Sequence, residues 1–160
     1  MSFAALHANA VDVVKGILDD GGHKVFREAD YRHPIERLPE QANHRHFQVV
    51  ATPIVEALER HGVLNDVRRA EVRVRVFYFA GGGDAGGGDR QSINALGFED
   101  TILIGKYLEN PLRYDAQNTG IQCRYGFRNE QTFEGDRSAV WDCVVTCQWE
   151  ENEDARAVVA

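Results

Sequence analysis

Three histidines, His33, His44 and His46, are the residues whose types and spacing are closest to those of a metal site. His44 and His46 are expected to share one face of a short strand, about 6.6 Å apart, while His33 lies in an irregular segment upstream. Zinc needs three or four ligands held in place. The sequence contains no HExxH motif and no paired CxxC motif. We therefore assign no metal and no cofactor, and keep metal binding by this group as an alternative.

Three cysteines, Cys123, Cys143 and Cys147, are the candidates for disulfide or nucleophilic chemistry. Cys143 and Cys147 are about 13 Å apart along one expected strand, too far to bridge each other, although Cys123 could face either across a hairpin. A thiol in the buried middle of a strand is inert. The neighbouring carboxylates Glu99 and Asp100 do not converge on a helix. We therefore predict buried thiols, no catalytic residue and no enzymatic activity.

A glycine-rich segment, Gly81–Arg90, has six glycines in ten residues. It lacks the Gly-Lys-Ser/Thr ending of a phosphate-binding loop, and its two aspartates would repel an anion. So many glycines predict a mobile loop rather than a packed element. If the loop has a role, we expect it to become ordered on contact with a partner, with Gly82, Asp84 and Gly87 as candidate contact residues.

Arginines and aromatic residues share one face of the most regular strand pattern, residues 71–80. Its two faces are Val72, Val74, Val76 and Tyr78 on one side, and Glu71, Arg73, Arg75, Phe77 and Phe79 on the other. Arg124 and Arg128 lie on the polar face of an expected C-terminal hairpin. If the two polar faces coincide, the sheet has an arginine-rich surface flanked by aromatic residues. Such a surface is typical of a protein interface; the alternatives are a solvated sheet face or the lining of a passage for DNA.

Helix and strand patterns place these residues in one α+β domain. Alternation over residues 121–149 predicts a long hairpin that turns within residues 129–138, with a buried Trp and Cys face and an exposed polar face. The other expected elements are helices at 2–18, 54–60 (opened by Thr52 and Pro53) and 93–109, strands at 45–51 and 71–80, and an irregular segment at 24–43. They favour a mostly antiparallel four-stranded sheet with helices packed on one face. This domain would span residues 1–150, and residues 151–160 would form an acidic flexible tail.

The composition is that of an acidic globular protein. Its 160 residues are 43% hydrophobic and 27% charged, enough for one ordinary core. The net charge of −7 disfavours a dedicated nucleic-acid binder, which usually has a basic surface. No apolar run approaches the roughly 20 residues needed to cross a bilayer. No secretory signal is visible at the N-terminus, so we expect a chain made in the cytoplasm and not bound to a membrane.

The order and size of these elements resemble the tail terminator, or tail completion, proteins of tailed bacteriophages and their neck relatives. The resemblance rests on the helix at 4–18, the strand at 71–79, the helix at 93–109 and the closing strand at 140–149. Such proteins form rings, typically hexameric, that cap the tail tube and join it to the head-side neck. The resemblance implies a structural virion protein of the tail or neck, assembled in the bacterial host cytoplasm. Its partners would be its own copies, the tail tube protein and a neck or head–tail connector protein, around a lumen through which DNA passes without sequence-specific binding.

The alternative from another functional class is a small ligand-binding or enzymatic α+β domain with a pocket between sheet and helices. A pocket protein needs polar groups that converge in a concave apolar site, whereas a ring protein needs two complementary surfaces on each copy. The ring function predicts an interface made of Arg73, Arg75, Phe77, Phe79, Gly82, Asp84, Gly87, Arg124 and Arg128. Replacing Arg73 and Arg75 with glutamate is then expected to disturb assembly and leave monomer stability nearly unchanged.

Overall fold

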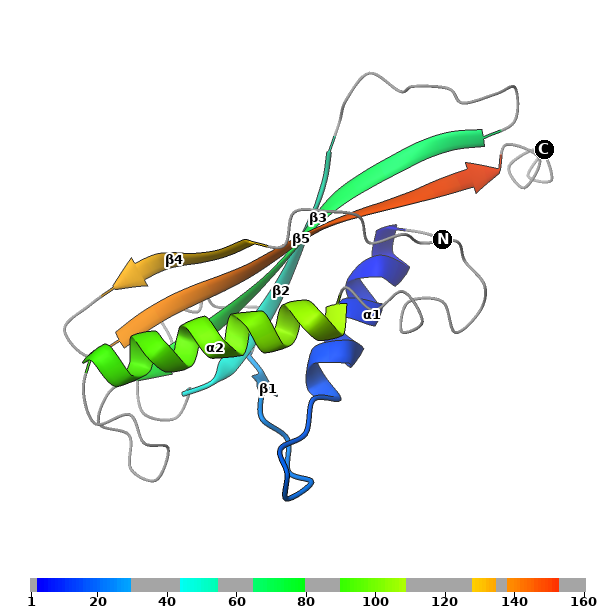
Figure 1. Cartoon of the computed structure of the whole chain (residues 1–160). Helices are drawn as coiled ribbons and strands as arrows, with labels where there is room; N and C mark the ends of the chain where they lie inside the picture. The colour runs from blue at the N-terminus through cyan, green and yellow to red at the C-terminus, as the bar shows by residue number, and fades with distance from the viewer. Residues whose placement is uncertain are drawn as a thin grey trace.

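The computed structural model describes residues 3–29, 44–54, 65–79, 90–108, 128–134 and 138–152. In this part of the chain two helices pack on one face of a five-stranded sheet (Figure 1). The elements are α1 (Phe3–Lys15), β1 (Arg27–Glu28), β2 (His46–Pro53), β3 (Asn65–Phe79), α2 (Arg90–Leu108), β4 (Arg128–Glu134) and β5 (Ser138–Asn152). The strand order is β1-β2-β3-β5-β4, and only the β1–β2 pair is parallel. The predicted single α+β domain is confirmed, but the sheet has five strands rather than four.

The additional strand is β1, which lies in a segment predicted to be irregular. It consists of two residues, Arg27 and Glu28, that pair with the start of β2. Two residues are too few for a period-two pattern, so only the tertiary pairing reveals this strand. α1 ends at Lys15 rather than at Leu18. In the turn that follows, the Asp19 carboxylate accepts the N–H groups of Gly21 and His23.

β2 is longer than predicted because it continues through Thr52 and Pro53. These residues pair with Glu71 and Ala70 of β3, so the prediction that they open a helix was wrong for both. A proline is tolerated at the end of a strand near a sheet edge, and here cross-strand pairing outweighs the local helix-start signal. The remainder of the predicted helix, residues 55–60, lies outside the described residues.

β3 and β5 form the backbone of the sheet. They pair over fifteen positions, from Asn65 opposite Asn152 to Phe79 opposite Ser138. The predicted faces of residues 72–78 are confirmed, because Val72, Val74, Val76 and Tyr78 are fully buried under the helices. The cysteine face of β5 is buried in the same core, as predicted, with Cys143, Val145 and Cys147.

β4 occupies residues in which the turn of the hairpin was predicted. It pairs with β5 from Arg128 to Glu134, with a bulge between Gln131 and Phe133, so the connection falls at residues 135–137. The last residue of the predicted first arm, Arg128, is the first residue of β4, and the rest of that arm, residues 121–127, lies outside the described residues. β5 runs to Asn152, so the first two residues of the predicted tail belong to a strand. Residues 153–160 lie outside the described part.

α2 packs mainly against β5, and its buried face is unusual for a helix. Besides Ile93, Ile104 and Leu108, this face contains Gly97 and Asp100. A Cβ atom at Gly97 would overlap the ring of Trp141, so glycine allows the β5 tryptophan to lie directly against the helix backbone. The carboxylate of Asp100 requires partners in the core, which are Arg45 in the turn before β2 and Tyr78 of β3.

Candidate functional site

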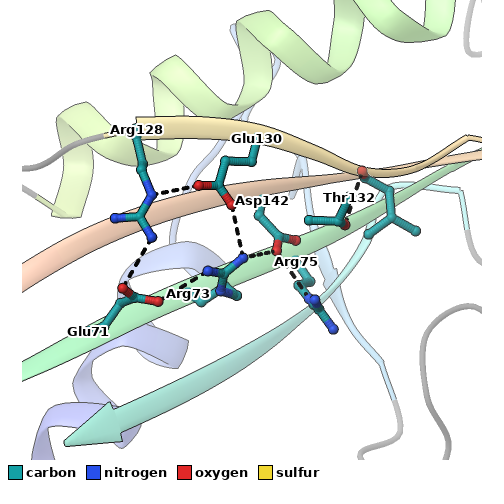
Figure 2. Close-up of polar contacts among 8 residues, drawn as sticks. Glu71, Arg73, Arg75, Arg128, Glu130, Thr132 and Asp142 are labelled. Carbon is teal, nitrogen blue, oxygen red and sulfur yellow. Dashed lines mark hydrogen bonds and ion pairs between the residues drawn. The ribbon is translucent and has the colours of Figure 1, made fainter. Parts of the chain in front are cut away.

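The sheet face opposite the helices carries a closed cluster of charged side chains from three strands. We call it the outer-face network; its members are Glu71, Arg73 and Arg75 of β3, Asp142 of β5, and Arg128 and Glu130 of β4 (Figure 2). The registers align these residues, because Arg75 lies opposite Asp142 and Asp142 lies opposite Glu130. The condition that the two arginine faces coincide is therefore met for Arg128.

Arg73 is the centre of the network. Its Nη1 donates to Asp142 Oδ2 at 2.6 Å and to Glu130 Oε2 at 3.3 Å, and its Nη2 donates to Glu71 Oε1 at 3.1 Å. Arg75 Nε also donates to Asp142 Oδ2, at 3.2 Å. One guanidinium thus joins carboxylates from all three strands.

Arg128 closes the network at the sheet edge. Its Nε donates to Glu130 Oε1 at 2.6 Å, and its Nη2 donates to Glu71 Oε2 at 3.2 Å. The bond from Arg128 lowers the pKa of Glu130. Figure 2 shows Glu71 and Glu130 each held between Arg73 and Arg128, so that four side chains form a ring of ion pairs.

The network is electrically balanced, with three arginines and three carboxylates. Burial opposes the charge on Arg73, but the bonds to Asp142 and Glu71 outweigh it, and the pKa of Arg73 is raised. Burial raises the pKa of Asp142, and Arg73 and Arg75 oppose that rise. Because its charges cancel internally, this surface lacks the uncompensated positive charge that binds DNA, and it suits a specific protein contact better than a DNA-binding surface.

Asp142 is the most buried member of the network. Its side chain is 0% exposed, and within the described residues its Oδ1 has no hydrogen-bond partner. The prediction that this face of β5 is exposed was therefore wrong for Asp142 and for Val144, which is also fully buried. The reason is tertiary: Arg73 and Arg75 reach across from the neighbouring strand to bond Asp142.

The other predicted interface residues have different surroundings. Phe77 and Phe79 are 2% and 5% exposed and pack with Val140 in a small apolar cluster. Their contribution to a partner contact stays a prediction. Gly82, Asp84, Gly87 and Arg124 lie outside the described residues, and their contribution also stays a prediction.

A second polar group, which sequence reasoning missed, lies between the sheet and α2. We call it the inner polar cluster: His44, Arg45, Tyr78 and Asp100. Arg45 donates to both carboxylate oxygens of Asp100, from Nε at 3.0 Å and from Nη2 at 2.9 Å. The Tyr78 hydroxyl donates to Asp100 Oδ2 at 2.8 Å. One signal was available, because Asp100 occupies a core position of its helix, seven residues after Ile93 and four before Ile104.

Burial controls the ionisation of this cluster. It raises the pKa of Asp100, and Arg45 opposes that rise. Burial, followed by the charge of Asp100, raises the pKa of Tyr78 well above its usual value. The tyrosine therefore stays protonated as a hydrogen-bond donor. The arrangement is that of a satisfied structural ion pair, which joins the start of β2 to α2.

The candidates for metal and thiol chemistry do not converge in the structure. His44 lies against Tyr78, on the helix side of the sheet, whereas His46 pairs with Phe77 of the opposite face. The expectation that they share one face was therefore wrong. The part of the chain that the structure describes contains no group of three residues able to hold a metal, and His33 is not in that part. Cys143 and Cys147 are buried thiols, as predicted, and Cys123 lies outside the described residues.

A shallow hollow lies on α1, lined by Asn9, Asp12, Val13 and Gly16. These residues belong to α1 and to the position directly after it, so the hollow is not the pocket between sheet and helices that the alternative function requires. Of the two described helices, neither is long and apolar enough to cross a membrane. The sequence matches no family model and no curated protein.

Proposed function

We propose that this chain is a structural subunit that acts by self-assembly, as a ring-forming tail terminator or neck protein of a tailed bacteriophage. One observation carries the proposal: in the described part of the chain, the two longest strands extend beyond the rest of the sheet. β2 accompanies β3 only as far as Ala70, and β4 accompanies β5 only as far as Val144. Residues 65–68 and 149–152 continue as a two-stranded ribbon, which we call the arm.

The arm has the properties of a contact element. Figure 1 shows the paired ends of β3 and β5 running past both helices. A two-stranded ribbon alone is marginally stable in water, and among the described residues no third strand pairs with its edges, which makes these edges templates for another chain. A neighbouring subunit that pairs with an edge of the arm would stabilise the ribbon.

The outer-face network supplies a second, different surface on the same subunit. It is held by bonds from three strands, so its side chains are already ordered before a partner arrives. A preorganised surface loses little entropy on binding. A ring needs two different, complementary surfaces on each copy, so that one surface of each subunit binds the other surface of its neighbour and the last subunit binds the first. The arm and the outer-face network would be these surfaces.

The proposed partners follow from the resemblance in element order and size. They are further copies of the chain, in a ring that we expect to be hexameric, the tail tube protein, and a neck or head–tail connector protein. The protein would then be part of the virion tail or neck. Passage of DNA through the lumen would require no specific contact, in agreement with the balanced charge of the outer-face network.

Light scattering on the purified chain, followed by negative-stain imaging, tests assembly directly. We expect a closed species with an open centre. Glu151→Pro should abolish it, because proline removes a backbone donor from the arm and is poorly accepted inside a strand pair. Glu151→Ala is the matched control: it keeps the backbone pairing and removes only the charge, so the ring should persist.

Two results would contradict the proposal. A wild-type chain that stays monomeric at all concentrations and does not bind tail tubes would exclude the ring function. Rings formed equally well by Glu151→Pro would show that the arm is not the contact. Circular dichroism on both variants verifies that the rest of the domain is folded.

A further inference from the structure

His44 lies in the turn before β2 and ties that turn to the C-terminal end of β3. Its Nδ1 accepts the backbone N–H of Phe79 at 3.0 Å. Its ring meets the ring of Tyr78 edge to face, with centroids 5.9 Å apart and an interplanar angle of 78°. The neighbouring Arg45 has a left-handed φ of 58° and donates its N–H to the Phe77 carbonyl at 2.7 Å. Two hydrogen bonds, one to the His44 side chain and one between backbone groups, therefore hold the end of β3 to this turn.

The bond from Phe79 determines the protonation of His44. A backbone N–H can only donate, so Nδ1 must present its lone pair and the proton of the neutral ring lies on Nε2. Among the described residues, Nε2 is buried and has no hydrogen-bond partner. A second proton can bind only at Nδ1, where it would point at the Phe79 N–H. Protonation of His44 is therefore incompatible with the Phe79 bond.

The charged and titratable groups around His44 also oppose a positive charge. Arg45 and His46 flank it on its own segment, Tyr78 contacts it from β3, and Asp100 of α2 accepts the hydroxyl of that tyrosine. Asp100 already accepts hydrogen bonds from Arg45 and Tyr78, and the positive charge of Arg45 compensates its negative charge. Burial, and then the positive charges of Arg45 and His46, lower the pKa of His44.

We propose that His44 is a pH-sensitive latch: as a neutral ring it closes the junction between the turn at residues 44–45 and the end of β3, and its protonation opens that junction. The latch sits where β3 ends, immediately before the glycine-rich sequence. This proposal is independent of the ring function, because it rests on the inner side of the sheet within one chain.

Nuclear magnetic resonance of the full chain between pH 7.5 and 4.5 tests the latch. The imidazole nitrogen shifts should place the proton on Nε2 at neutral pH. As His44 titrates, protection of the Phe79 amide against hydrogen exchange, corrected for intrinsic pH dependence, should fall about fivefold, the factor for a net bond of about 1 kcal/mol. The amide of Val74, in the middle of β3, should not follow this titration.

Two variants sharpen the test. His44→Asn places an uncharged oxygen near the position of Nδ1, so it should keep Phe79 protected and remove the pH dependence. His23→Gln, at a histidine whose side chain is 82% exposed, should behave like the wild type. The proposal is overturned if Nδ1 carries the proton at neutral pH, or if Phe79 stays protected while His44 titrates. If His44→Asn does not fold, the wild-type titration alone decides.

Discussion

Arg73→Ala should destabilise the folded chain far more than Arg128→Ala, although both arginines belong to the outer-face network. Arg73 is 22% exposed and bonds Asp142, a carboxylate with no exposed surface. Arg128 is 45% exposed, and its partners among the described residues are the partly exposed Glu71 and Glu130. The two variants therefore compare a buried ion pair with a surface ion pair in the same cluster.

The expected magnitudes follow from burial. Removing one partner of a buried ion pair costs about 3–5 kcal/mol, because the remaining charge is left in the protein interior. Arg75 Nε keeps one bond to Asp142, at 3.2 Å, so we expect a loss at the lower end of that range, about 3 kcal/mol. Surface ion pairs contribute about 0–1 kcal/mol, so Arg128→Ala should cost no more than that.

Urea denaturation at pH 7, followed by circular dichroism, measures both free energies of unfolding. It should be repeated at several protein concentrations, because self-assembly makes apparent stability concentration-dependent. The double variant Arg73→Met with Asp142→Leu should recover much of the loss, since an apolar pair can replace a buried ion pair. Equal losses for Arg73→Ala and Arg128→Ala, within about 0.5 kcal/mol, would refute the reasoning.

This geometry also revises the expectation for glutamate at positions 73 and 75. On a solvated face these changes would leave the monomer nearly unaffected. In the structure they would place two further carboxylates against the buried Asp142. The double replacement is therefore expected to unfold the monomer as well as to abolish assembly. Loss of assembly in this variant would not by itself show that the two arginines form an interface.

Three further predictions concern the core. Gly97→Ala should cost about 1–3 kcal/mol in a thermal melt and alter the near-ultraviolet signal of Trp141, since the new methyl group overlaps that ring; a more stable variant would contradict this. Tyr78→Phe should lose about 1.5–3 kcal/mol in urea denaturation, because it removes a buried donor to a charged carboxylate, and a loss below about 0.5 kcal/mol would argue against that contribution. The lowered pKa of His44 means that the unfolded chain binds its proton more readily than the folded chain. Wild-type stability should therefore fall relative to His44→Asn as the pH drops below about 6.5, and parallel curves for the two proteins would contradict this.

The sequence by itself determined the fold class and the main faces of the sheet. Side chains alternate between the two faces of a strand, so the valines at 72, 74 and 76 had to be buried together, with Arg73 and Arg75 on the other face. Helical spacing likewise predicted α2 at residues 93–109, close to its observed bounds of Arg90–Leu108. A long periodic segment contains enough repeats to be recognised.

Only the tertiary structure decided the partners of the charged residues. Arg45 and Asp100 are 55 positions apart, and Arg73 and Asp142 are 69 apart, so no local pattern could pair them. The same holds for β1, whose two residues become a strand only beside β2, and for Pro53, which pairs with Ala70 instead of starting a helix. Local spacing dictates which way a side chain points, whereas its partner depends on which distant segment the fold brings beside it.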